Sequence, residues 1–137
     1  MELNGTWYNE LGSFMTLKVK GPNLSGTYQT AVGDAEGIYE LVGRVVTDEF
    51  SSEVLGWVVV WQNEYGNSES VTAWSGQCQT VGGVPTIVST WLLTSETDPG
   101  DDWHSTLVGK DVFTNTQPSA EQIKTNRAAG DKVPFPK

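Results

Sequence analysis

The sequence predicts an all-β protein: an eight-stranded antiparallel up-and-down β-barrel. Three observations predict this fold. β-branched and aromatic runs recur at short intervals, turn-forming residues separate them, and no helix-period pattern of useful length precedes residue 117. The 137 residues also include six tryptophans and 15 glycines, while only 18% are charged. Large rings, frequent turns and few charges are typical of a β fold that builds a site from aromatic surface.

Eight runs are the expected strands, and glycine, proline, asparagine or aspartate interrupts the chain between them. Consecutive antiparallel strands joined by short loops close naturally into a barrel, because closure removes the exposed edges. A two-sheet sandwich would use the same strands, so it stays open as an alternative. In chain order the runs are residues 5–9, 13–19, 25–31, 38–46, 54–62, 70–77, 86–94 and 103–113.

Residues 1–117 form the expected barrel domain, and residues 118–137 form a C-terminal tail. Residues 120–129 of the tail can form a short helix. Two prolines, Pro134 and Pro136, break the last residues, which we expect to be loose.

Composition excludes several classes of function. The formal net charge of −9 has the wrong sign for a protein that binds nucleic-acid phosphates or an anionic membrane surface. No apolar run approaches the roughly 20 residues of a membrane-spanning helix, and no signal-peptide pattern opens the sequence. The single cysteine, Cys78, cannot form a disulfide within the chain, and the single histidine, His104, leaves little scope for metal binding.

Polar residues recur on the apolar faces of the expected strands. Residues two apart in a strand share a face, so Trp74 lies with Ser70 and Thr72, and Asp111 lies with Leu107 and Phe113. These polar groups could satisfy one another or the backbone. Their recurrence on matching faces instead indicates the lining of a concave site for a small ligand with a compact polar head and an apolar frame.

Motifs spread along the barrel region resemble those of the avidin/streptavidin family of biotin-binding proteins, nearest in motif to its streptavidin members. The resemblance runs from residue 5 to about residue 119, and all six tryptophans stand at family positions. The triplet at residues 5–7 alone also occurs in lipocalins, whereas the full ordered set is specific. The blocks are Gly5-Thr6-Trp7-Tyr8-Asn9, Gly26-Thr27-Tyr28, Leu55-Gly56-Trp57, Trp74-Ser75-Gly76-Gln77, Trp91-Leu92-Leu93-Thr94-Ser95, and residues 103–113 with Asp111.

The resemblance implies non-catalytic, high-affinity binding of biotin at one mouth of the barrel, with no cofactor. Three neutral donors would bind the ureido oxygen, and an ionised Asp111 with Thr30 would accept from the ureido N–H groups. Thr72 would face the sulfur, while Ser70 and the backbone of residues 32–35 would hold the carboxylate. The implied site residues are Asn9, Ser13, Tyr28, Thr30, Val32, Gly33, Asp34, Ala35, Trp61, Ser68, Ser70, Thr72, Trp74, Trp91, Leu93, Trp103, Leu107 and Asp111.

The same resemblance implies a homotetramer, a dimer of dimers, in which Trp103 projects into a neighbouring subunit's pocket. It also implies an extracellular protein, while the net charge of −9 argues against nucleic-acid and membrane partners. Three positions depart from streptavidin: Thr30 replaces serine, Asp34 replaces asparagine in the lid, and Lys110 replaces histidine at a subunit contact. Thr30 keeps a hydroxyl acceptor, whereas Lys110 alters the subunit contact.

Two other functions are weaker alternatives. A lipocalin-like carrier of larger apolar ligands would keep the barrel but would not need Asp111 or the matched hydroxyls. A hydrolase has no support, because Gly-x-Ser-x-Gly is absent and His104 lies in a loop without an evident nucleophile.

Overall fold

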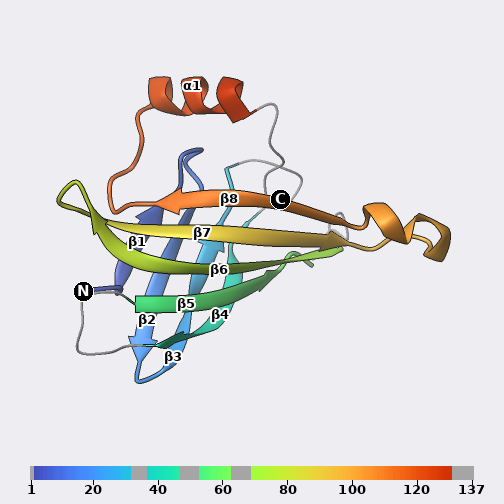
Figure 1. Cartoon of the computed structure of the whole chain (residues 1–137), viewed down its shortest axis with the longest axis horizontal. Coiled ribbons are helices and arrows are strands. Elements are labelled where there is room, and N and C mark those ends of the chain that lie inside the picture. Colours follow the sequence, from blue (N-terminus) through green and yellow to red (C-terminus); the bar gives the residue numbers. More distant parts are fainter. Residues whose placement is uncertain (1, 32–36, 47–52, 63–68, 131–137) are drawn as a thin grey trace.

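A computed structural model describes residues 2–31, 37–46, 53–62 and 69–130. Eight antiparallel strands form one sheet in which every strand pairs with its neighbour in the sequence (Figure 1). The expected strands are confirmed, with ends that differ by a few residues. They are β1 (Gly5–Tyr8), β2 (Phe14–Lys20), β3 (Asn23–Gln29), β4 (Tyr39–Val46), β5 (Glu53–Val60), β6 (Ser70–Val81), β7 (Val84–Ser95) and β8 (Thr106–Phe113).

The sheet curls until its first and last strands meet, which favours the barrel over the sandwich. Tyr8 at the end of β1 donates its N–H to the Thr114 carbonyl over 2.7 Å, and Thr114 donates to the Tyr8 carbonyl over 3.0 Å. Asn115 adds a side-chain hydrogen bond of 2.9 Å to the Thr6 carbonyl. The seam between β1 and β8 therefore depends on few backbone bonds and on side chains from the adjoining loops.

Alternate residues of each strand point inward, and this period of two builds the core. Trp7 and Trp57 belong to that core, as expected. Trp7 donates its indole N–H to the Leu3 carbonyl over 2.9 Å, and Cys78 is also fully buried. Each of these side chains packs among aliphatic and aromatic neighbours, so their burial contributes to the stability of the barrel.

Two helices lie outside the sheet. The 3₁₀ helix η1 (Pro99–His104) precedes β8, and α1 (Ala120–Gly130) follows it. The prediction that the last strand begins at Trp103 is wrong: Trp103 lies in η1, because Pro99 and Gly100 favour a tight turn over an extended strand. The predicted helix in the tail is confirmed and is one residue longer. Within the described ranges, no helix combines the length and the apolar character needed to cross a membrane.

The strand order brings several strand ends together at one end of the barrel. Because consecutive strands run in opposite directions, the last residues of β1, β3, β5 and β7 lie at the same end as the first residues of β2, β4, β6 and β8. Predicted site residues near that end include Asn9, Ser13, Thr30, Trp61 and Ser70.

Candidate binding site

A buried carboxyl group, that of Asp111, is the centre of the polar groups inside the barrel. Asp111 lies on the inner face of β8 and has no exposed surface. The Trp74 indole N–H donates to its Oδ2 over 2.9 Å, and the Asn9 amide donates to its Oδ1 over 3.3 Å. Asp111 also shares a hydrogen bond with the Glu10 side chain. An ionised carboxylate offers about four lone-pair positions, so Asp111 could still accept a hydrogen bond from a ligand.

The loop between β1 and β2 fixes the orientation of Asn9. The Asn9 Oδ1 atom accepts from the backbone N–H groups of Leu11 and Ser13, each over 3.0 Å. The amide nitrogen is thereby directed at Asp111 inside the barrel. This local side-chain-to-backbone bonding is the usual role of asparagine in a turn.

Three hydroxyl-bearing residues accompany Asn9. The Ser13 Oγ atom accepts from the Ala31 N–H over 2.8 Å and lies 3.5 Å from the Thr30 Oγ1 atom. Tyr28 is buried on the inner face of β3. Burial, with the negative charges of Asp111 and Glu10, raises the pKa of Tyr28 well above its ordinary value. Its hydroxyl therefore keeps its proton and can donate a hydrogen bond.

Aromatic rings surround these polar groups. Tyr28 packs against Trp74 and Trp61 with ring centroids 5.0 and 5.5 Å apart, and Trp57 stacks behind Trp74 at 5.4 Å. The Trp61 N–H donates to the Thr72 Oγ1 atom over 2.7 Å, which leaves the Thr72 hydroxyl proton available to another acceptor. The buried rings thus define a rigid apolar wall with polar groups at fixed positions.

The register of β6, β7 and β8 aligns other predicted residues. Thr72 lies opposite Leu93, which lies opposite Leu107, and in the next inward-facing row Trp74 lies opposite Trp91. Leu93 is buried, whereas Leu107 is 44% exposed near the start of β8. Ser70 is buried at the start of β6. The Trp91 indole nitrogen is buried and has no hydrogen-bond partner in the described part of the chain.

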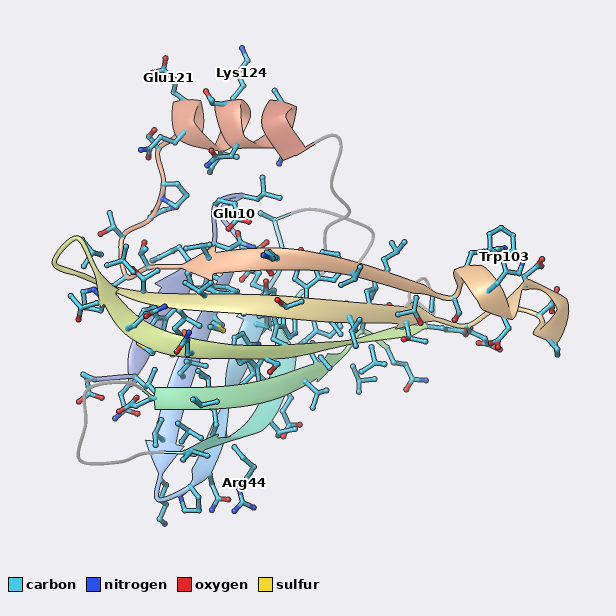
Figure 2. The ribbon with its side chains drawn as sticks, in the orientation of Figure 1. Glu10, Arg44, Trp103, Glu121 and Lys124 are labelled. Atoms are coloured by element: carbon cyan, nitrogen blue, oxygen red, sulfur yellow. The ribbon has the colours of Figure 1, made fainter. Side chains whose placement is uncertain are left out.

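Trp103 is the one described site residue that the structure does not bring to the others. It lies on η1 and is 82% exposed. Its ring packs edge-on against His104 at a centroid distance of 4.3 Å, and Figure 2 shows it directed away from the barrel. The predicted contacts Val32, Gly33, Asp34, Ala35 and Ser68 lie outside the described residues.

A second carboxyl group, that of Glu10, was not identified from the sequence. Burial first, and then the nearby Glu10 carboxyl, raise the pKa of Asp111 to about 8, while the bonds from Trp74 and Asn9 act in the opposite direction. Burial likewise raises the pKa of Glu10, whose Oε2 atom accepts from the Val112 N–H over 3.1 Å. The Asp111 and Glu10 carboxyl groups are also hydrogen-bonded to each other. In the ligand-free chain this pair therefore keeps a proton to a higher pH than an isolated aspartate would, which differs from the ionised Asp111 expected from the sequence. In the sequence, the position of Glu10 directly after Asn9 could have indicated a carboxyl group close to the site.

The barrel encloses a buried acid, fixed hydroxyl groups and tryptophan rings. This combination is typical of a protein that binds a small ligand. The family model described as the avidin family matches residues 1–116. Avidin of Gallus gallus is 36% identical over 127 residues, which cover 87% of this chain and 81% of that protein. Avidin-related protein 4/5 of Gallus gallus is 36% identical over 119 residues (82% and 76%), and afifavidin of Afifella pfennigii is 33% identical over 119 residues (82% and 68%).

This chain belongs to the avidin family, a family of non-catalytic biotin-binding proteins. The family expected from the ordered motifs is thereby confirmed.

Proposed function

We propose that the chain binds biotin inside the barrel, with the polar cluster around Asp111 holding the ureido group. The observation that carries this proposal is the fully buried Asp111, which Trp74 and Asn9 hold in place while part of its accepting capacity remains. A buried polar group needs partners, and the two N–H groups of a ureido ring are suitable donors. Membership of the avidin family is the second support.

In this arrangement Asn9, Ser13 and Tyr28 donate to the ureido oxygen, while Asp111 and Thr30 accept from its N–H groups. The directed Asn9 amide and the protonated Tyr28 hydroxyl support these roles. The two ureido donors would favour the ionised form of Asp111 in the complex. Its negative charge would then polarise the ureido group and strengthen the bonds to the ureido oxygen. None of these steps breaks a covalent bond, so the chemistry is recognition alone.

The rest of the ligand would meet the aromatic wall and the open end. Trp61, Trp74 and Trp91 would enclose the bicyclic ring, and Leu93 and Leu107 would complete the wall. The Thr72 hydroxyl would face the sulfur. Ser70 would hold the carboxylate together with Ser68 and the backbone of residues 32–35, which lie outside the described residues.

A homotetramer, as a dimer of dimers, would give the exposed Trp103 its role as a wall of a neighbouring subunit's pocket. The outer face of β7 and β8 supports assembly, because Val88 lies opposite Val112 and Leu92 opposite Val108, and all four are exposed. Such an apolar patch is typical of an interface between proteins. Lys110 lies opposite Thr90 within it, so its charge would have to be accommodated. Family membership also supports an extracellular location.

Biotin should quench the tryptophan emission of the chain and saturate at one ligand per chain, because three indole rings would contact it. The measurement is a fluorescence titration, with a fluorescent fatty acid as the comparison ligand. Displaceable binding of the fatty acid, with no response to biotin, would favour the lipocalin-like carrier instead.

Trp103→Lys should speed biotin release and weaken assembly, because it replaces a large apolar contact with a charge that must lose water. Release kinetics and light scattering measure the two effects, and Trp103→Phe is the matched control that keeps an apolar ring. A native chain that is monomeric and still binds biotin tightly would refute the role across subunits.

A further inference from the structure

The helix α1 lies beyond the residues that the family model matches, which end at 116. It begins at a defined position, because Ser119 and Gln122 form a reciprocal capping box. The Gln122 N–H donates to the Ser119 Oγ atom over 3.1 Å, and the Ser119 N–H donates to the Gln122 Oε1 atom over 2.9 Å. Such a box satisfies backbone donors at a helix start, so the sequence specifies this helix locally.

Two side chains of α1 contact the loop between β1 and β2. The Asn126 amide donates to the Glu10 carbonyl over 2.8 Å. Ile123 approaches Gly12 so closely that its Cδ1 atom lies 2.9 Å from where a Cβ atom at Gly12 would be. Gly12 has a φ of +87°, so glycine suits both the backbone and the close approach of the helix.

The contacted loop is the one that orients Asn9 and Ser13. Besides the two bonds to the Asn9 side chain, the Asn9 N–H donates to the Ser13 carbonyl over 2.9 Å, and the Gly12 N–H donates to the Asn9 carbonyl over 3.2 Å. Glu10 is held from two sides, since its carbonyl binds α1 and its carboxyl group binds the Val112 N–H on β8. A shift of this loop would therefore move the donors that we assign to the ureido oxygen.

The remainder of α1 packs loosely. A groove of about 290 Å³ between the helix and the β1–β8 seam is lined by residues that include Tyr8, Glu10, Val112 and Asn126. In Figure 2 Glu121 and Lys124 project away from the barrel, on the side of the helix opposite Glu10. Ile123 and Asn126 are the two half-buried residues among positions 120–128, so they hold the helix against the loop.

We propose that α1 is a latch on the β1–β2 loop, and that Ile123 and Asn126 are positioning residues that keep Asn9 and Ser13 in their ligand-binding orientation. This inference rests on the proposed binding of biotin. The latch raises the free energy of loop displacement without touching the ligand, so its loss should act mainly on ligand release rather than on association.

The test uses the full chain with Ile123→Ala, Asn126→Asp and the double variant. Asn126→Asp keeps the shape of the side chain but removes the donor to the Glu10 carbonyl. Lys124→Ala, on the outward side of the same helix, is the control. We expect biotin release to quicken about fivefold in each single variant and about 20-fold in the double, from the typical strength of one such contact. Lys124→Ala should match the native chain.

Amide hydrogen exchange in the ligand-free chain distinguishes a local effect on the β1–β2 loop from a general loss of barrel stability. The Leu11 and Ser13 amides should exchange faster in the variants, while the strand amide of Trp74 should not change. Unchanged loop amides and release rates would overturn the latch, and so would an equal acceleration throughout the barrel. If the native chain fails to bind biotin, the proposed function fails, and the loop amides still decide whether the latch exists.

Discussion

Replacing Asp111 with alanine is expected to weaken biotin binding on the order of 100-fold. Asp111 has no exposed surface, so water cannot replace a hydrogen bond that it makes to the ligand. In the proposed complex Asp111 is ionised, and a hydrogen bond to a charged group contributes about 1.5–3 kcal/mol. Each 1.4 kcal/mol corresponds to about tenfold in affinity. The substitution also leaves the Trp74 and Asn9 donors without the acceptor they now share.

Ser70→Ala is the matched comparison, measured by the same competition titration. Ser70 is neutral, lies at the start of β6 and keeps 7% of its surface exposed, whereas Asp111 has none. Loss of one neutral hydrogen bond corresponds to about 1 kcal/mol, so we expect a tenfold decrease or less. Equal losses in the two variants would contradict the central position given to Asp111.

The second large effect is a loss of stability of the ligand-free chain as the pH rises. The pKa of Asp111 is about 8 in the folded chain, against about 3.9 in an unfolded one. The folded chain therefore binds this proton more tightly, so the contribution of the group to stability is complete below about pH 4 and is lost as the pH rises towards 8. We expect the free energy of unfolding to fall by up to about 1.4 kcal/mol per pH unit in this window.

Urea denaturation between pH 5 and pH 9 measures how the free energy of unfolding changes with pH. Two variants test whether Asp111 is the group responsible. Asp111→Asn cannot ionise and should remove most of the slope, leaving a chain more stable than the native one at pH 8. Glu10→Gln removes the neighbouring charge that raises the pKa of Asp111, so it should move the window to lower pH. A native chain whose stability does not depend on pH in this range would show that Asp111 is ionised there.

Most of the fold could be predicted from the strand pattern, because alternating apolar residues and turn residues are local properties of the sequence. Closure of the barrel at Tyr8 and Thr114 depends on strand tilt and stagger, which no local pattern records. Trp103 was predicted in a strand, whereas the tight turn that begins at Pro99 places it on η1.

The candidate site was predicted in part. The inner-face positions of Thr72, Trp74 and Asp111 follow from a period of two, and their burial agrees with it. The effect of Glu10 on Asp111 could not be predicted in this way, because it joins a turn to a strand about 100 residues later. The contacts of Asn126 and Ile123 with the β1–β2 loop are likewise set by where the helix packs.

The most direct measurement of the central claim is a calorimetric titration of the ligand-free native chain with biotin. Burial of the ureido group against Asp111 and of the ring against tryptophans predicts heat that saturates at one biotin per chain. The absence of heat on addition of stoichiometric biotin, with tryptophan emission unchanged, would contradict the account.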